Sequence, residues 1–387
     1  MTDDAKRVCI TGIGAVSAFG GTAEALWRGV SGGVSAVAPI TLFDAAGLAC
    51  RIAAEAKHYH AREDMDAAAA ASMDRRMLFA ADAAIQALIQ SDLPINAETV
   101  SQIGVAVGAE MPERASTTAA TVARTIGAAG PVMHLANGAA SGLMAIGEAA
   151  EWIRREECAI AVAGGAEAPI TAETLAHFDA LGMLTHNNDD PQHAMRPFDV
   201  GRDGFALGEG AAMVVLEDED VAVRRGANIL AYVDGYGATF NRSSVLVAAA
   251  NELDAGRAMQ KALIKWDLTL QGEIDVIFAS AGGGGLDAIE GKAIRRVWGP
   301  NTDKLWVTTI KPAIGHTLGA SGAMSLVAAI FSLQAGLIPP AVNLEHADPE
   351  CGELEVVTES VRRLHGTKAI VNAFGLGHNA SVIISRP

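Results

Sequence analysis

The stretch MHLANGAASGLMAIGEAAEWIRREECAIAVAGGAE, Met133–Glu167, decides the fold of this 387-residue chain. Its pattern predicts the end of a strand, a turn of small residues over 137–142, a helix over about 141–155 and a buried strand over 159–165. A turn of this kind places one side chain at a helix N-terminus, where free N–H groups favour developing negative charge. Enzymes use such turns to present a nucleophile. The residue at this turn is Ala139, so we expect an active-site frame without its nucleophile.

This stretch resembles the nucleophile segment of the β-ketoacyl carrier-protein synthases, a family with the thiolase-like fold. In that family a run such as A-C-A-T-G carries the catalytic Cys, and a V-A-G-G-x-E strand follows the next helix. Aligned without gaps, GAASG places Ala139 at the Cys and Ser141 at the small hydroxyl residue two positions later. The resemblance continues in RVCITGIG at the start of the chain and in RPFDVGRDGFALGEGA from Arg196, and it covers essentially the whole chain.

Strand and helix patterns alternate along the rest of the chain and predict an α/β fold with buried strands. The resemblance implies the thiolase-like architecture, a duplicated αβαβα layered sandwich with mixed, largely parallel sheets. It divides the chain into an N-terminal half over 1–228 and a C-terminal half over 229–387. Helices are expected over 22–30, 74–90, 251–266, 287–298 and within 314–335, and strands over 7–14, 104–108, 211–217, 274–279, 305–309, 356–358, 369–374 and 380–384.

The composition excludes several classes of function. A net charge of −16 argues against a nucleic-acid surface, which needs clustered Lys and Arg. The arginine pairs at 75–76, 154–155 and 295–296 are candidate contacts for an acidic carrier protein, or ordinary solvated helix ends.

The cysteines and the apolar segments indicate where the protein resides. Four scattered cysteines without metal spacing indicate buried thiols in a reducing compartment. The N-terminus does not read as a signal peptide, so a cytoplasmic location is expected. The apolar segment 316–342 reaches membrane-span length, but its Gly, Ser and Pro content favours a buried core helix rather than a membrane span.

The family resemblance implies three catalytic elements: the Cys thiolate, two imidazoles, and backbone N–H groups that bind the oxyanion. The segment KPAIGHTLGASGA matches the second histidine motif and supplies Lys311 and His316. The position of His316 before a helix favours a lowered pKa and a neutral ring that can donate a hydrogen bond. These two residues are the retained catalytic candidates.

The first histidine of the family is absent. In FASAGGGGLDAIEG the residues Gly282, Gly283, Gly284 and Gly285 stand in its place, while Asp287 and Glu290 keep the downstream register. Four glycines could cradle a phosphate, but the P-loop Lys-Ser/Thr is missing. We interpret the run as a degenerated catalytic loop. Residues 109–132 are also shorter than the family's usual insert, which predicts a reshaped acyl pocket.

The C-terminal segment NAFGLGHNAS resembles the family's N-S-F-G-F-G-G-T-N, with Leu376 in place of the aromatic residue that gates the pocket. The resemblance implies that the backbone at Ala139 and Leu376 would form the oxyanion site. His378 could replace the missing imidazole, or be satisfied within its loop. Ser141 could replace the nucleophile, or serve as a hydroxyl at the helix N-terminus.

The pattern of losses resembles the chain-length factors, the ketosynthase β subunits of type II polyketide systems. This implies a subunit without independent condensing activity that forms a heterodimer with an active ketosynthase and shapes its acyl tunnel. Acyl and malonyl groups would arrive on the phosphopantetheine of an acyl carrier protein, with no other cofactor and no metal. Two alternatives remain: residual malonyl decarboxylase or acyltransferase activity using His316 with Ser141 or His378, and an engineered Cys-to-Ala variant at Ala139.

Overall fold

The structure, a computed structural model, describes residues 6–62, 65, 67–111, 117–241, 251–264 and 272–387. Within these residues the main sheet has eleven strands in the order β13-β11-β10-β15-β16-β9-β1-β8-β6-β4-β5. The strands of the first half are β1 (Val8–Val16), β4 (Ile103–Gly108), β5 (Val132–Leu135), β6 (Ile160–Glu167) and β8 (Gly210–Asp218). Those of the second half are β9 (Ala231–Phe240), β10 (Val276–Phe278), β11 (Trp306–Thr308), β13 (Glu355–Val356), β15 (Lys368–Gly375) and β16 (His378–Ser385).

The sheet is mixed, as expected, but parallel pairing is confined to its two outer parts. The strands β5, β4 and β6 are parallel to one another, and so are β15, β10, β11 and β13. The strands between these two groups pair antiparallel. Residues 8–10 of β1 pair with 231–233 of β9, and this short contact joins the sheets of the two halves into one.

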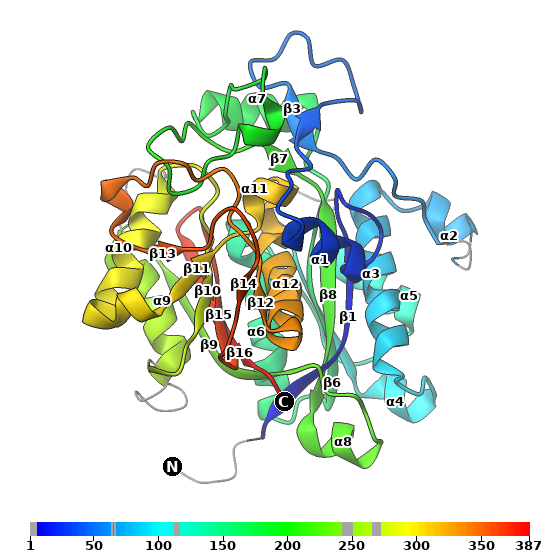
Figure 1. The fold of residues 1–387 in the computed structure, drawn as a ribbon. Helices are drawn as coiled ribbons and strands as arrows, with labels where there is room; N and C mark the ends of the chain where they lie inside the picture. Colours follow the sequence, from blue (N-terminus) through cyan, green and yellow to red (C-terminus); the bar gives the residue numbers. More distant parts are fainter. Residues whose placement is uncertain (1–5, 63–64, 66, 112–116, 242–250, 265–271) are drawn as a thin grey trace.

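The helices complete five layers, which confirms the thiolase-like architecture (Figure 1). The central layer contains α6 (Ser141–Arg154) and α12 (Ser321–Ala335), which pack with residues of both halves of the sheet in the largest hydrophobic cluster. On one outer face α3 (Arg75–Ser91) and α5 (Thr117–Ile126) cover the first half, and on the other α9 (Glu252–Ile264) and α10 (Leu286–Trp298) cover the second. The predicted helix over 251–266 is observed as α9 over Glu252–Ile264, and positions 265–266 lie outside the described residues.

Smaller elements surround this sandwich. Three short strands, a cluster of apolar side chains and α7 (Ala172–Ala180) form a cap beside the central layer. The remaining elements are α1 (Ala23–Ser31), α2 (Ala67–Ala71), α4 (Ala97–Ser101), α7 (Ala172–Ala180), α8 (Glu219–Arg224), α11 (Lys311–Ile314), β2 (Ala38–Pro39), β3 (Ile52–Ala54), β7 (Leu207–Gly208), β12 (Leu337–Ile338) and β14 (Arg362–Arg363).

The two central helices begin in the same way, which fits the predicted duplication. A single 3₁₀ turn precedes each helix: η1 (Gly138–Ala140) before α6 and η6 (Leu318–Ala320) before α12. The two halves meet through glycines, because a Cβ at Gly142 of α6 or at Gly165 of β6 would lie 2.6 Å from the carbonyl oxygen of Gly319 in η6. The backbones of the two halves therefore touch directly beside Ala139.

The apolar segment near the C-terminus is a core helix. One helical segment among the described residues, Leu318–Ala335, is long and apolar enough to cross a membrane, but 83% of it is buried inside the protein. This agrees with the expected core role of α12. The four cysteines are likewise buried and free of disulfides.

Most of the arginine pairs are engaged by carboxylates of the chain itself. Five of these six arginines form ion pairs, Arg75 with Glu209, Arg76 with Glu167, Arg154 with Glu151, Arg155 with Glu157 and Arg295 with Glu353. These ion pairs disfavour a carrier-protein contact for the five arginines, but the alternative of solvated helix ends does not hold for Arg76, which is buried.

Candidate active site

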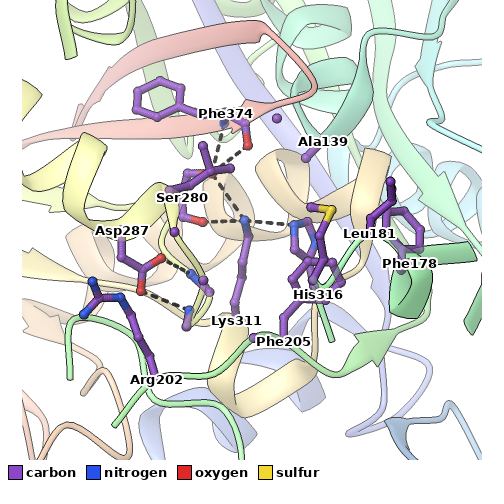
Figure 2. A pocket seen from close by; sticks show the side chains of 18 of the residues that line it. Ala139, Phe178, Leu181, Arg202, Phe205, Ser280, Asp287, Lys311, His316 and Phe374 are labelled. Atoms are coloured by element: carbon purple, nitrogen blue, oxygen red, sulfur yellow. Dashed lines mark hydrogen bonds between the residues drawn. The ribbon is translucent and has the colours of Figure 1, made fainter. Parts of the chain in front are cut away.

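A cavity of about 680 Å³ opens where four segments meet. They are the turns η1 and η6, the loop over 282–285 (the glycine loop) and the segment over 374–376 at the end of β15 (the C-terminal loop). It brings together five of the features singled out in the sequence. These are Ala139, the loop Gly282–Gly285, Lys311, His316 and Leu376. Residues separated by more than 200 positions thus line one space, as the resemblance predicted (Figure 2).

Ala139 lies in η1 immediately before α6, with 3% of its surface exposed. Gly138 takes a φ of 61°, a left-handed conformation that glycine adopts without strain and that allows the sharp turn. The C-terminal loop packs against this turn, since a Cβ at Gly375 would lie 2.9 Å from the Cβ of Ala139. The frame of a nucleophile turn is therefore intact, and a methyl group occupies its centre.

The glycine loop is held by one carboxylate. Asp287 Oδ1 accepts the N–H of Gly282 (3.1 Å), and Oδ2 accepts the N–H groups of Gly283 and Phe198 (3.0 Å each). A Cβ at Gly282 would lie 3.2 Å from Lys311 Cδ and 3.9 Å from His316 Cδ2. A side chain at this position would thus point at the retained pair, and none is present.

His316 is buried and fixed in one tautomer. Its Nδ1 accepts the backbone N–H of Leu318 (3.0 Å) and lies 3.1 Å from Ser321 Oγ, so a neutral ring carries its proton on Nε2. Burial, assisted by the nearby positive charge of Lys311, lowers the pKa of His316 well below its usual value. The predicted neutral donor is thus present, although burial rather than the helix N-terminus is the main cause.

Lys311 lies between Ser280 and His316 (Figure 2). Its Nζ donates to the carbonyl oxygen of Ser280 and lies 3.4 Å from His316 Nε2. Burial lowers the pKa of Lys311, while the carboxylates of Glu290, Asp287 and Glu110 oppose that shift. The retained pair is therefore tightly held, and both of its members are displaced toward their neutral forms.

The two possible substitutes lie outside the cavity wall. Ser141 Oγ donates to the carbonyl oxygen of Gly138 (2.6 Å) and accepts the N–H of Asn137 (2.7 Å), so it stabilises the turn. His378 packs its ring against Phe240 with 4.9 Å between centroids. Neither residue is among those that line the cavity, which favours the structural alternative for both.

Several lining residues were not singled out from the sequence. Phe178, Leu181 and Phe205 form an apolar wall, with the Phe205 ring 4.7 Å from that of His316. Glu110 adds a carboxyl group, and Ser280 a hydroxyl that accepts the N–H of Phe374 (2.9 Å). The sequence predicts no strand or helix at positions 110, 178, 181 and 205, and a single polar residue after a strand gives no spacing signal.

Comparison with known proteins agrees with this geometry. The family model of the β-ketoacyl synthase N-terminal domain matches residues 5–222, and that of the C-terminal domain matches 230–345. The chain belongs to the β-ketoacyl synthase family. Among β-ketoacyl synthases, it is similar to the putative polyketide β-ketoacyl synthase 1 of Streptomyces cyaneus, at 34% identity over 99% of this chain and 98% of that protein. It is also similar to 3-oxoacyl-[acyl-carrier-protein] synthase 2 of Synechocystis sp., at 33% identity over 98% of each chain.

Solved β-ketoacyl synthase structures share the fold over the full chain. The ishigamide ketosynthase/chain length factor superposes with a TM-score of 0.89 at 27% identity, covering 99% of this chain and 100% of the other. A β-ketoacyl synthase from Burkholderia phymatum superposes with a TM-score of 0.90 at 28% identity, with the same coverage. These relatives and solved structures agree with membership of the β-ketoacyl synthase family.

Proposed function

We propose that this β-ketoacyl synthase homologue is a non-condensing, chain-length-factor-like subunit. It forms a heterodimer with an active ketosynthase and shapes the tunnel into which that enzyme builds an acyl chain. The observation that carries the proposal is the cavity itself. It retains the Ala139 turn and the Lys311–His316 pair, but its described lining contains no thiol, and glycines stand where the first histidine is expected.

The proposal assigns a role to particular residues of the cavity. Ala139 marks the position of the lost nucleophile and, with Leu376, the oxyanion region, while Gly282–Gly285 mark the lost histidine. The acyl and malonyl groups are delivered on the phosphopantetheine of an acyl carrier protein in the cytoplasm. Among the solved structures that resemble this chain is one described as a ketosynthase/chain length factor, which supports this kind of partner.

A second candidate function is supported by the retained pair. A neutral His316 with its proton on Nε2, 3.4 Å from Lys311 Nζ, could stabilise the charge that develops when malonyl-carrier protein loses carbon dioxide. This would make the chain a decarboxylase without a condensing step. An engineered Cys-to-Ala change is less consistent with the cavity, because it would not account for Gly282–Gly285.

Co-expression with an active ketosynthase from the genome that encodes this chain tests the proposed pairing. The chain carries a removable affinity tag and the ketosynthase is untagged, and the complex is examined by size-exclusion chromatography with light scattering. We expect a one-to-one complex that survives dilution. Recovery of the tagged chain alone, with an active ketosynthase left in the flow-through, would contradict the proposal.

A further inference from the structure

Glu110 is fixed beside the cavity by a buried network that spans three elements. It follows β4, and its backbone N–H donates to Glu167 Oε2 at 2.7 Å. Glu167, at the end of β6, accepts from Arg76 Nη1 of α3 at 2.9 Å. On the opposite side the backbone of Gly319 approaches closely, since a Cβ there would lie 2.6 Å from the nitrogen of Glu110. The main chain of Glu110 therefore has little freedom, and its side chain forms part of the cavity wall.

The carboxyl group of Glu110 is incompletely satisfied. Its residue is half-buried, and its Oε2 is buried with no hydrogen-bond partner among the described residues. The charged groups that face it are Glu167 from β6, Lys311 from α11 and, through Glu167, Arg76 from α3. Burial and the Glu167 carboxylate raise the pKa of Glu110 to about 8, although Lys311 opposes the shift. At neutral pH the group is therefore mainly a protonated acid that can donate one hydrogen bond.

A carboxyl group in such a position discriminates between ligands. An alkyl chain that fills the cavity would offer the carboxyl group no hydrogen-bond partner and so keep it unpaired, which is unfavourable. A chain that carries a carbonyl or hydroxyl oxygen near Glu110 would accept its proton in a hydrogen bond. Sites built to hydrogen-bond a ligand reject analogues that lack the matching group.

We propose that Glu110 is a specificity-determining residue, which selects acyl chains bearing a hydrogen-bond-accepting oxygen over plain alkyl chains of the same length. The inference rests on the proposed function in taking the cavity to hold an acyl chain. It goes further in naming the chemistry of that chain and the residue that recognises it.

Calorimetric titration of the purified chain tests this selection. The probes are three pantetheine thioethers of equal chain length, one with an alkyl chain, one with a β-keto group and one with a β-amino group. The variants are Glu110→Gln, which keeps a neutral hydrogen-bond donor, and Glu110→Leu, which removes it. We expect the wild type to bind the β-keto probe on the order of tenfold more tightly than the alkyl probe. Glu110→Gln should keep that preference, and Glu110→Leu should lose it.

The pH dependence of the binding preference distinguishes selection by a hydrogen bond from Glu110 from a purely steric role of this residue. In the wild type the preference for the β-keto probe should fall as pH rises through about 8, because the carboxylate can no longer donate. In Glu110→Gln the preference should not change with pH. A preference that persists in Glu110→Leu, or tightest binding of the β-amino probe, would overturn the inference.

The outcomes also distinguish this inference from the proposed function. If no probe binds the wild type, the cavity is not an acyl site and the inference fails. If the Glu110-dependent preference is found but the chain forms no complex with a ketosynthase, the inference stands and the proposed pairing fails.

Discussion

Ala139 decides what this site can do, because every other part of the nucleophile turn is in place. The turn, the helix N-terminus behind it and the packed C-terminal loop would favour a thiolate at this position. The four native cysteines have no such environment. Burial raises the pKa of Cys9 and Cys351 to about 12 and that of Cys158 to about 11, and it also raises that of Cys50.

Ala139→Cys should therefore create one reactive thiol in an otherwise inert chain. We expect the folded variant to be alkylated by iodoacetamide at least about tenfold faster than the wild type, since reactivity follows the thiolate fraction. Intact-mass measurement over time gives the rate. Ala140→Cys is the matched control, because Ala140 is fully buried and does not line the cavity. Equal rates for Ala139→Cys and the wild type would show that the turn does not activate a thiol.

His316 should make the protein less stable in mild acid. Its pKa is low in the folded state, and in the unfolded chain it returns to about 6.5. Below that value the unfolded state binds a proton that the folded state does not, so the free energy of unfolding falls by up to about 1.4 kcal/mol per pH unit. This contribution is fully present above pH 6.5 and is lost as pH decreases.

The variant His316→Asn removes this titration while its amide oxygen can still accept the N–H of Leu318. Urea unfolding at about pH 7.5 and 5.5 should show a smaller loss of stability for the variant than for the wild type. An equal loss in both proteins would mean that folding does not lower the pKa of His316.

At the scale of the elements, the glycine loop depends on α10. Asp287, in the first turn of that helix, accepts three buried N–H groups from the loop and from Phe198. Glycine permits the φ of 96° at Gly283 but contributes no side chain that could hold the loop.

Asp287→Ala should leave these N–H groups unpaired and lower the free energy of unfolding by about 3 kcal/mol or more. Asp287→Asn retains one acceptor oxygen and should cost less. Denaturant unfolding of both variants measures the difference. A loss below about 1 kcal/mol for Asp287→Ala would show that the loop is held by other contacts.

Strand β6 and the turn η6, which belong to different halves of the chain, meet where only glycine fits. A Cβ at Gly165 would come within 2.6 Å of the Gly319 carbonyl oxygen, whereas one at Gly47 would meet no atom within 4 Å. We expect Gly165→Ala to lower the free energy of unfolding by about 1–3 kcal/mol through overpacking, and Gly47→Ala to change it by less than about 0.5 kcal/mol. Similar thermal unfolding of the two variants would contradict this account of the contact between the halves.

At the scale of the whole molecule, features set by residues close together in the sequence could be predicted. Features set by contacts between residues far apart in the sequence could not. The turn before α6, the Lys311–His316 segment and the glycine run were found because each is a local motif. The β1–β9 pairing that joins the two sheets, and the antiparallel centre of the sheet, rest on contacts between distant strands without a sequence signal. Glu110 was missed for the same reason, because its burial and its position in the cavity wall come from β6, α11 and η6 rather than from its neighbours in sequence.

The cavity also shows which predicted roles could be decided only from the three-dimensional structure. Ser141 and His378 were possible substitutes by position alone, but the hydroxyl of Ser141 is used within its turn and the ring of His378 packs on Phe240. The lining that remains is mainly apolar, and its charged or titratable side chains are those of Glu110, Arg202, Asp203, Asp287, Lys311, His316 and Asp348. Such a wall is suited to contain an acyl chain rather than to carry one covalently.

Intact-mass spectrometry after incubation with acyl- and malonyl-carrier protein tests the central claim, that this chain shapes a ketosynthase without being acylated. The chain is measured alone and together with an active ketosynthase from the genome that encodes it. We predict that only the partner gains acyl mass and that elongated product forms only when both are present. An acyl group on this chain, or acetyl-carrier protein released by it alone, would contradict the claim and identify it as an enzyme.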